Sequence, residues 1–198
     1  MGDNVEWGIL FMGSVGSGKT CAIRSISDIG VVDTDAVATD QTASLKSHTT
    51  VAMDVGVLHL SGNGKLRLCG APGQDRFDFM WDILLLQCRG LVLFVNHADP
   101  ASLTALDHYL AALEQRLVGR RMPMVIGVTH VDQNPRVPLD RYRARLQERP
   151  CSFMDIQPPV FSIDAREATQ VRGLLAALTG LLEMAARFPA GQRKGTGA

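Results

Sequence analysis

Unbroken apolar runs alternate with amphipathic stretches along most of the chain. Residues 91–95 (LVLFV) and 124–128 (MVIGV) carry no charged or hydrogen-bonding side chain, which is typical of strands buried on both faces of a parallel sheet. Shorter apolar runs at 7–11 and 160–163 predict two further strands. Strands that alternate with helical segments predict a layered α/β fold.

Two more predicted strands are joined directly to each other. Residues 51–60 and 65–69 flank the turn SGNG, whose Asn63-Gly64 dipeptide is typical of a β-hairpin. The hairpin introduces one antiparallel strand. We therefore expect a mostly parallel six-stranded sheet with one antiparallel hairpin strand.

Apolar residues spaced three and four apart predict helices between the strands. The pattern covers residues 103–117, a shorter stretch at 139–146 and a terminal stretch at 171–182. A fourth helix is expected at 20–26, directly after a glycine-rich turn. We interpret these apolar stripes as core faces that pack on both sides of the sheet, in three layers.

Length and composition indicate one globular domain. The chain has 198 residues, and we place the domain at 1–188 and a flexible tail at 189–198.

The charged residues and cysteines indicate the class of protein and its compartment. Twenty basic and twenty acidic residues cancel, which argues against a nucleic-acid-binding protein. Four widely spaced cysteines indicate thiols in a reducing compartment. The N-terminus lacks the pattern of a signal peptide and no segment is long enough to cross a bilayer, so we expect a cytoplasmic protein.

The segment GSVGSGKT, residues 13–20, matches the P-loop pattern G-x-x-x-x-G-K-[ST] in full. It follows a predicted buried strand and opens a predicted helix, which is the structural context that this motif needs. Its backbone amides would surround phosphate oxygens, and the helix adds its positive N-terminal end. Lys19 would reach the β- and γ-phosphates and the Thr20 hydroxyl would bind Mg²⁺. The predicted phosphate-binding residues are Gly13, Ser14, Val15, Gly16, Ser17, Gly18, Lys19, Thr20 and Cys21.

A second group of motifs follows in a fixed order. They are TTVAMDVG (49–56), GAPGQDRF (70–77), THVD (129–132) and SIDAR (162–166). In this order the chain resembles the Ras-like small GTPases from about residue 7 to residue 188. The first two motifs are most similar to those of the bacterial MglA-like group, whose members work with Roadblock/LC7-domain proteins.

The resemblance implies a catalytic role for three residues. Gln74 would orient the attacking water, Gly73 would donate its amide to the γ-phosphate, and Lys19 would neutralise the phosphates. Thr50, or its neighbour Thr49, would contact Mg²⁺ and the γ-phosphate from a switch loop at 28–50.

The resemblance also implies that the nucleobase of the bound nucleotide is guanine. Asp132 would accept hydrogen bonds from guanine, and the last motif contributes Asp164 and Ala165. Thr129 and His130 stand where the family carries asparagine and lysine, so we expect weaker guanine affinity than in other members. The implied protein is a GTP/GDP- and Mg²⁺-dependent switch, stimulated by a Roadblock/LC7-type partner and recruited by a partner to a membrane or cell pole.

Two positions depart from the family pattern. Gly70 occupies the place of an acid that supports Mg²⁺, and Asp54 on the neighbouring strand is the best substitute. Our hypothesis is that Asp54 holds a water bound to Mg²⁺; the alternative is an ordinary acid on the exposed face of an edge strand. Val15 stands where glycine is common, and its branched side chain predicts slow intrinsic hydrolysis.

Two other classes of protein remain open. A P-loop ATPase or nucleotide kinase would need a lid with several arginines, and residues 133–150 contain candidates in Arg136, Arg141, Arg143 and Arg145. The helical spacing at 139–146 favours an amphipathic surface helix instead. The other class is a nucleotide-binding scaffold that does not hydrolyse.

Overall fold

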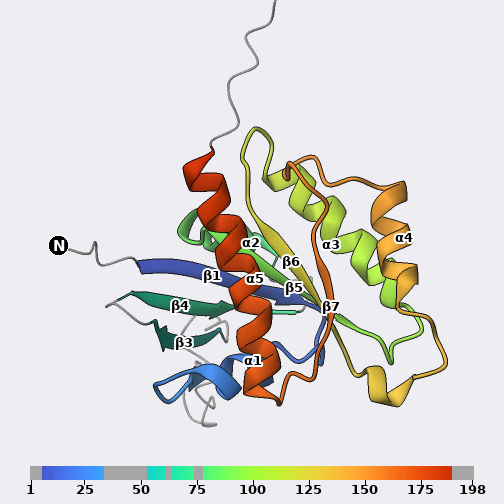
Figure 1. Ribbon diagram of the computed structural model, residues 1–198, viewed down its shortest axis with the longest axis horizontal. Helices are drawn as coiled ribbons and strands as arrows, with labels where there is room; N and C mark the ends of the chain where they lie inside the picture. The colour runs from blue at the N-terminus through green and yellow to red at the C-terminus, as the bar shows by residue number, and fades with distance from the viewer. Residues whose placement is uncertain (1–5, 34–52, 61–63, 74–77, 189–198) are drawn as a thin grey trace, which may run out of the picture.

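A computed structural model describes residues 6–33, 53–60, 64–73 and 78–188 of the protein (Figure 1). These residues form one sheet with the strand order β2-β3-β4-β1-β5-β6-β7. Its strands are β1 (Glu6–Gly13), β2 (Val32–Asp33), β3 (Asp54–His59), β4 (Lys65–Gly70), β5 (Gly90–Asn96), β6 (Met124–Thr129) and β7 (Val160–Ser162).

The predicted α/β P-loop fold is confirmed. All six expected strands are present, β3 and β4 pair antiparallel as a hairpin, and β4, β1, β5, β6 and β7 run parallel to their neighbours. The two-residue β2 extends the sheet beyond β3 at its edge. The four expected helices are α1 (Lys19–Ile26), α3 (Ser102–Arg116), α4 (Asp140–Glu148) and α5 (Ala168–Arg187).

One helix was not predicted from the sequence. Helix α2 (Phe79–Gln87) reads FMWDILLLQ and is apolar around most of its circumference, so it has no helical period to detect. Its inner face is buried through Trp81, Leu84 and Leu85, whereas Phe79, Ile83 and Leu86 are exposed. The helix is therefore defined by packing on the sheet and not by amphipathicity.

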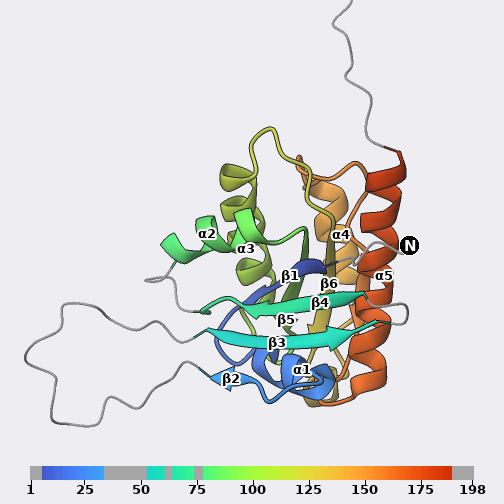
Figure 2. The same cartoon turned by 90° about the vertical axis from the view of Figure 1, so that its left-hand side faces the viewer.

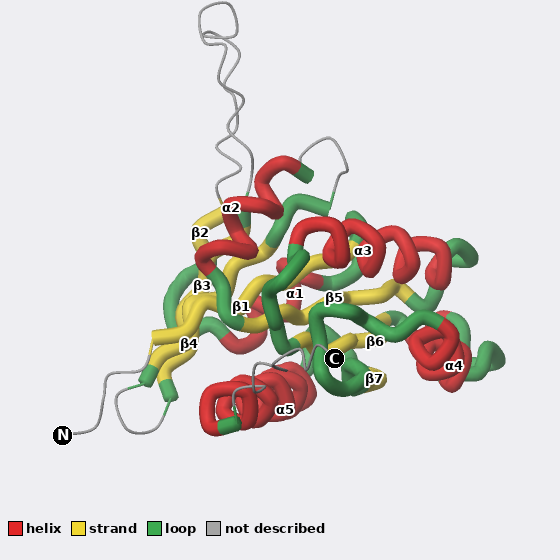
Figure 3. Tube along the Cα trace, turned by 90° about the horizontal axis from the view of Figure 1, so that it is seen from above, coloured by secondary structure: helices red, strands yellow, loops and turns green. Residues whose placement is uncertain are grey.

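Side chains alternate along the central strand and separate the core into two layers. Leu10 and Met12 of β1 belong to the layer covered by α2, α3 and α4. Ile9 and Phe11 belong to the opposite layer, beneath α1 and α5. Seen along the sheet in Figure 3, α2 and α3 lie on one side of the strands and α5 lies on the other. The three-layer arrangement follows from this period of two.

The parallel strands all end on the same side of the sheet, where β1 leads into α1 (Figures 1 and 2). In open α/β sheets, ligands bind at these carboxyl ends of the strands. Helix α5 ends on the opposite side, near the amino ends of the strands (Figure 1). None of the helices in the described part of the chain is long and apolar enough to span a membrane.

Candidate functional site

The loop between β1 and α1 depends on glycines at its two ends. Gly13 has φ 138°, and a Cβ at this position would lie 2.4 Å from the carbonyl oxygen of Phe94 on the adjacent strand. Gly18 precedes α1 in the left-handed region, with φ 97°. Only glycine adopts these conformations without strain. The sequence motif 13–20 is thus built as a P-loop at a helix N-terminus, where backbone amides favour anions.

Lys19 is buried at the base of this loop. Its ammonium donates hydrogen bonds to the carbonyl oxygens of Gly13 at 2.7 Å and Ser14 at 2.8 Å. Burial lowers the pKa of Lys19 to about 8, while the nearby carboxylate of Asp54 acts in the opposite direction. The charge that would neutralise phosphates is therefore held in place by the loop itself.

Thr20 and Asp54 meet beside the loop. The Thr20 hydroxyl donates to Oδ2 of Asp54 at 2.5 Å, although the two residues are 34 positions apart. Asp54 is the cross-strand partner of Gly70, and a Cβ on Gly70 would lie 3.2 Å from that same carboxylate oxygen. The carboxylate thus occupies the space that a side chain at position 70 would need. A hydroxyl and a carboxylate are oxygen ligands of the kind that Mg²⁺ prefers, so this pair fits a metal held together with phosphate oxygens.

Gly73 approaches the P-loop from the end of β4. A Cβ on Gly73 would lie 2.7 Å from the backbone nitrogen of Val15 and 2.9 Å from the carbonyl oxygen of Gly13. Val15 itself is 65% exposed at the mouth of the loop. Two of the predicted residues, Gln74 and Thr50, lie outside the described residues.

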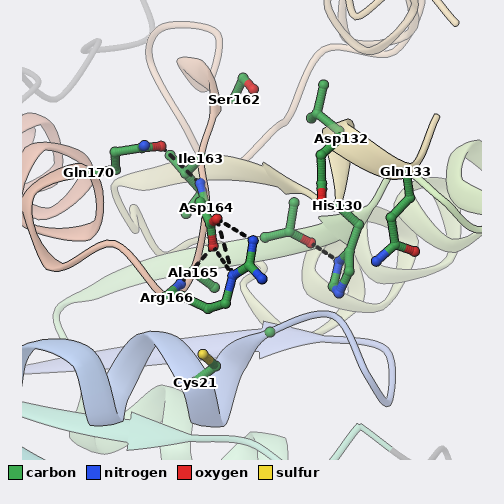
Figure 4. A pocket seen from close by; sticks show the side chains of 13 residues that line it. Cys21, His130, Asp132, Gln133, Ser162, Ile163, Asp164, Ala165, Arg166 and Gln170 are labelled. Atoms are coloured by element: carbon green, nitrogen blue, oxygen red, sulfur yellow. Dashed lines mark hydrogen bonds and ion pairs between the residues drawn. The ribbon is translucent and has the colours of Figure 1, made fainter. Parts of the chain in front are cut away.

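A pocket of about 400 Å³ opens beside the P-loop (Figure 4). It is formed where α1, the segment after β6 and the segment after β7 converge. The predicted residues Gly18, Cys21, Thr129, His130, Asp132, Asp164 and Ala165 all line it, together with Arg166 and Gln170, which were not predicted. The structure therefore brings the proposed base-side residues, which come from two separate segments of the sequence, together beside the end of the P-loop.

Thr129 connects this pocket to the P-loop. Its buried hydroxyl lies 3.0 Å from the carbonyl oxygen of Ser17 and 3.3 Å from that of Val95. Carbonyl oxygens only accept hydrogen bonds, so the hydroxyl donates to them and is free to accept from Nδ1 of His130 at 2.9 Å. A threonine at this position thus supports the P-loop, as an asparagine would.

His130 has a left-handed backbone conformation, with φ 56°. Such a conformation in a residue other than glycine costs roughly 1–2 kcal/mol and is found most often at functional sites. It turns the chain into η2, a short 3-10 helix over Val131–Gln133 that carries Asp132.

The far wall of the pocket contains an ion pair. Arg166 contacts both carboxylate oxygens of Asp164, at 2.6 to 3.1 Å (Figure 4). Hydrogen bonds from Arg166 lower the pKa of Asp164 to about 2. The backbone amide of Asp164 donates to Gln170, which fixes this loop to the start of α5. The signal for Arg166 was present in the sequence, since it ends the same motif, SIDAR.

Comparison with known families decides the membership of the chain. The family model "Conserved hypothetical ATP binding protein" matches residues 28–180. The chain belongs to this family. The match contains the segment GAPG (70–73), Asp132 and the SIDAR loop, and the P-loop precedes it. Members of the family bind a nucleotide through a P-loop fold. None of the curated proteins compared with the chain matches it.

The resemblance to the MglA-like small GTPases is wrong as an assignment of family, because the matching family is that of ATP-binding proteins. The reason lies in what the motifs encode. A P-loop meets the general requirements of phosphate binding, and many families of nucleotide-binding proteins share it. Such motifs identify a site more reliably than a lineage.

Proposed function

We propose that the protein binds GTP through this site, hydrolyses it slowly and acts as a switch between GTP- and GDP-bound states. The observation that carries the proposal is the position of Asp132 in a pocket that Thr129 ties to the P-loop. Guanine presents two adjacent donors, on N1 and the 2-amino group, to a carboxylate. Adenine presents an unprotonated N1 there, which a carboxylate would repel.

The residues around the P-loop suggest how the triphosphate would be held. Lys19 lies where the β- and γ-phosphates would bind, and Gly73 is close enough to the loop for its amide to reach the γ-phosphate. Thr20 and Asp54 would hold Mg²⁺, which neutralises charge on the phosphates when bound. Asp54 would act through a water and replace the acidic residue that is absent at position 70.

The slow hydrolysis that we propose follows from the side chain of Val15 at the mouth of the P-loop. Val15 is 65% exposed, a Cβ on Gly73 would lie 2.7 Å from its backbone nitrogen, and Gln74 directly follows Gly73 in the chain. The branched side chain of Val15 would compete for the space in which Gln74 must orient a water. A partner that completes the site would accelerate turnover. The expected Roadblock/LC7-type regulator, and recruitment by a partner to a membrane or pole, rested on the resemblance to the MglA-like group, and the family match does not support them.

Single-turnover hydrolysis tests the proposal. Wild-type protein and Gln74→Ala are loaded with GTP and Mg²⁺, and release of phosphate is followed. We expect a slow rate for the wild type, lowered at least tenfold by the substitution. Equal rates near that of free GTP would contradict a hydrolase and support a scaffold that only binds.

A second candidate is ATP binding and hydrolysis, which the description of the family favours. The same experiment with ATP separates the two candidates. Faster turnover and tighter binding of ATP than of GTP would favour this candidate, and Asp132 would then have another role.

A further inference from the structure

We infer that His97 is a positioning residue that holds the base-recognition turn, residues 129–134, in place for the nucleobase. The inference rests on the proposed function, because it concerns the same pocket. His97 itself does not line the pocket. It directly follows β5 and lies behind the turn, only 1% exposed.

His97 contacts both ends of the turn. Its backbone amide donates to the carbonyl oxygen of Thr129 at 2.9 Å. Its ring Nε2 lies 3.1 Å from the backbone carbonyl oxygen of Asn134, and the side-chain amide nitrogen of Asn134 lies 3.5 Å from the carbonyl oxygen of His97. One residue therefore joins the last residue of β6 to the residue that follows η2, and Asp132 lies between these two points.

The chemistry of the ring fixes how it bonds. The oxygen of Asn134 can only accept, so Nε2 of His97 must donate to it. A neutral imidazole then has an unprotonated Nδ1, which accepts from the hydroxyl of Tyr142 at 2.8 Å. Tyr142 is fully buried in α4, and its ring meets that of His97 edge-on with centroids 5.6 Å apart. The turn is thus connected through His97 to a rigid helix.

The turn needs such support because it has little packing of its own. None of the residues of η2 is buried, and Asp132 is exposed. The preceding residue, His130, has a left-handed backbone that does not stabilise the turn. Since a hydrogen bond to the base requires a carboxylate held within a fraction of an ångström, an anchor behind the turn would affect base selection directly.

The simpler explanation is that His97 is a buried histidine that stabilises the fold and has no effect on the site. The two explanations differ in what a substitution changes. A purely structural residue would lower the stability of the protein and would alter GTP and ATP binding alike. A positioning residue would alter the preference between GTP and ATP.

Titration calorimetry with GTP and with ATP, in the presence of Mg²⁺, tests the inference on the full chain. We expect His97→Ala to reduce the ratio of GTP to ATP affinity about tenfold, through weaker GTP binding. His97→Gln keeps a donor and an acceptor and should restore most of the ratio. Tyr142→Phe, which removes one hydroxyl, should reduce the ratio about threefold. Tyr109→Phe is the matched control, since it changes a buried tyrosine in α3 beside Trp81, and should leave the ratio unchanged.

An unchanged GTP to ATP ratio in His97→Ala and Tyr142→Phe, with a lower melting temperature, would overturn the inference. If His97→Ala does not fold, Tyr142→Phe alone decides. Failure of the proposed function has a different signature. In that case wild-type protein itself shows no preference for GTP, or Asp132→Ala leaves the preference unchanged.

Discussion

Asp54 and Gly70 face each other across the β3–β4 hairpin, and the carboxylate of the first fills the space that a side chain of the second would occupy. The carboxylate accepts a hydrogen bond from Thr20, the last residue of the P-loop motif. The carboxylate thus lies beside the P-loop, on the strand next to the one that ends at Gly70. This relationship is the basis of the proposal that Asp54 supports Mg²⁺ although position 70 carries no acid.

Replacement of Asp54 should weaken Mg²⁺-dependent nucleotide binding. We expect Asp54→Ala to lower the affinity for GTP 10–100-fold with Mg²⁺, the range found when a group supporting a metal is removed. Without Mg²⁺ the effect should be small. Binding is measured by calorimetry with Mg²⁺ or with EDTA. Asp28→Asn is the matched control, because Asp28 also bonds to β3, at His59, but not to Thr20.

The same geometry predicts a rescue. Gly70→Asp alone should destabilise the protein by about 1–3 kcal/mol, because its Cβ would lie within 3.2 Å of Asp54 and Ile23. In the double variant Asp54→Ala/Gly70→Asp the acid returns to the strand end and the crowding is relieved. Mg²⁺-dependent affinity should recover at least partly. A double variant no better than Asp54→Ala would show that the carboxylate position is not interchangeable.

Nucleotide affinity should fall as the pH rises above about 8. Burial lowers the pKa of Lys19 from 10.5 to about 8, so free protein loses this charge as the pH passes that value. Binding of a triphosphate then requires uptake of a proton, and affinity should be about tenfold lower at pH 9 than at pH 7. The effect of Lys19 on stability has the opposite sign. The unfolded chain binds more protons than the folded chain between about pH 8 and 10.5, so stability rises there.

The pH profile has a direct control. Lys19→Ala should bind nucleotide weakly and without this pH dependence. A wild-type affinity that stays constant from pH 7 to pH 9, measured by calorimetry in buffers matched for ionic strength, would mean that Lys19 keeps its charge and would contradict the lowered pKa.

The hydroxyl of Thr129 should support both the P-loop and the fold. Thr129→Val keeps the shape of the side chain and removes the hydrogen bonds to Ser17 and His130. We expect a loss of about 1 kcal/mol in the free energy of unfolding, with several-fold weaker nucleotide binding. Thr179→Val removes an exposed hydroxyl that bonds to Ala176 in α5 and serves as the control. Denaturant titration and calorimetry on both variants give the comparison.

Gly73 should be essential for the approach of its segment to the P-loop. A Cβ at this position would lie 2.7 to 2.9 Å from three backbone atoms of residues 13–15, which cannot move aside as a side chain would. We expect Gly73→Ala to reduce single-turnover hydrolysis at least tenfold. Gly173→Ala in α5, where a Cβ meets no atom within 4 Å, should have no effect on hydrolysis. Normal hydrolysis by Gly73→Ala would show that this contact is not part of the reacting state.

The parallel strands and most of the site could be predicted because each depends on a local pattern. The apolar runs at 91–95 and 124–128 have the length and composition of buried strands, and the spacing of residues 13–20 encodes a P-loop. Helix α2 was missed because a helix that is apolar on both faces has no period, and β2 was missed because two residues carry no pattern.

Tertiary relationships were harder to predict. Asp54 was placed near the site only through the predicted pairing of its strand with the one that ends at Gly70, and its hydrogen bond to Thr20 was not predicted. His97 and Tyr142 are 45 residues apart, and neither belongs to a motif. Family membership could not be read from the motifs, since these reflect the chemistry of binding phosphates and a base.

Calorimetric titration of wild-type protein and Asp132→Ala with GTP, GDP and ATP, in the presence of Mg²⁺, tests the central claim most directly. We predict that GTP and GDP bind to the wild type, that ATP binds at least tenfold more weakly, and that Asp132→Ala removes this preference. Binding of ATP as tight as that of GTP to wild-type protein would contradict guanine selection by Asp132 and favour the ATP-binding alternative.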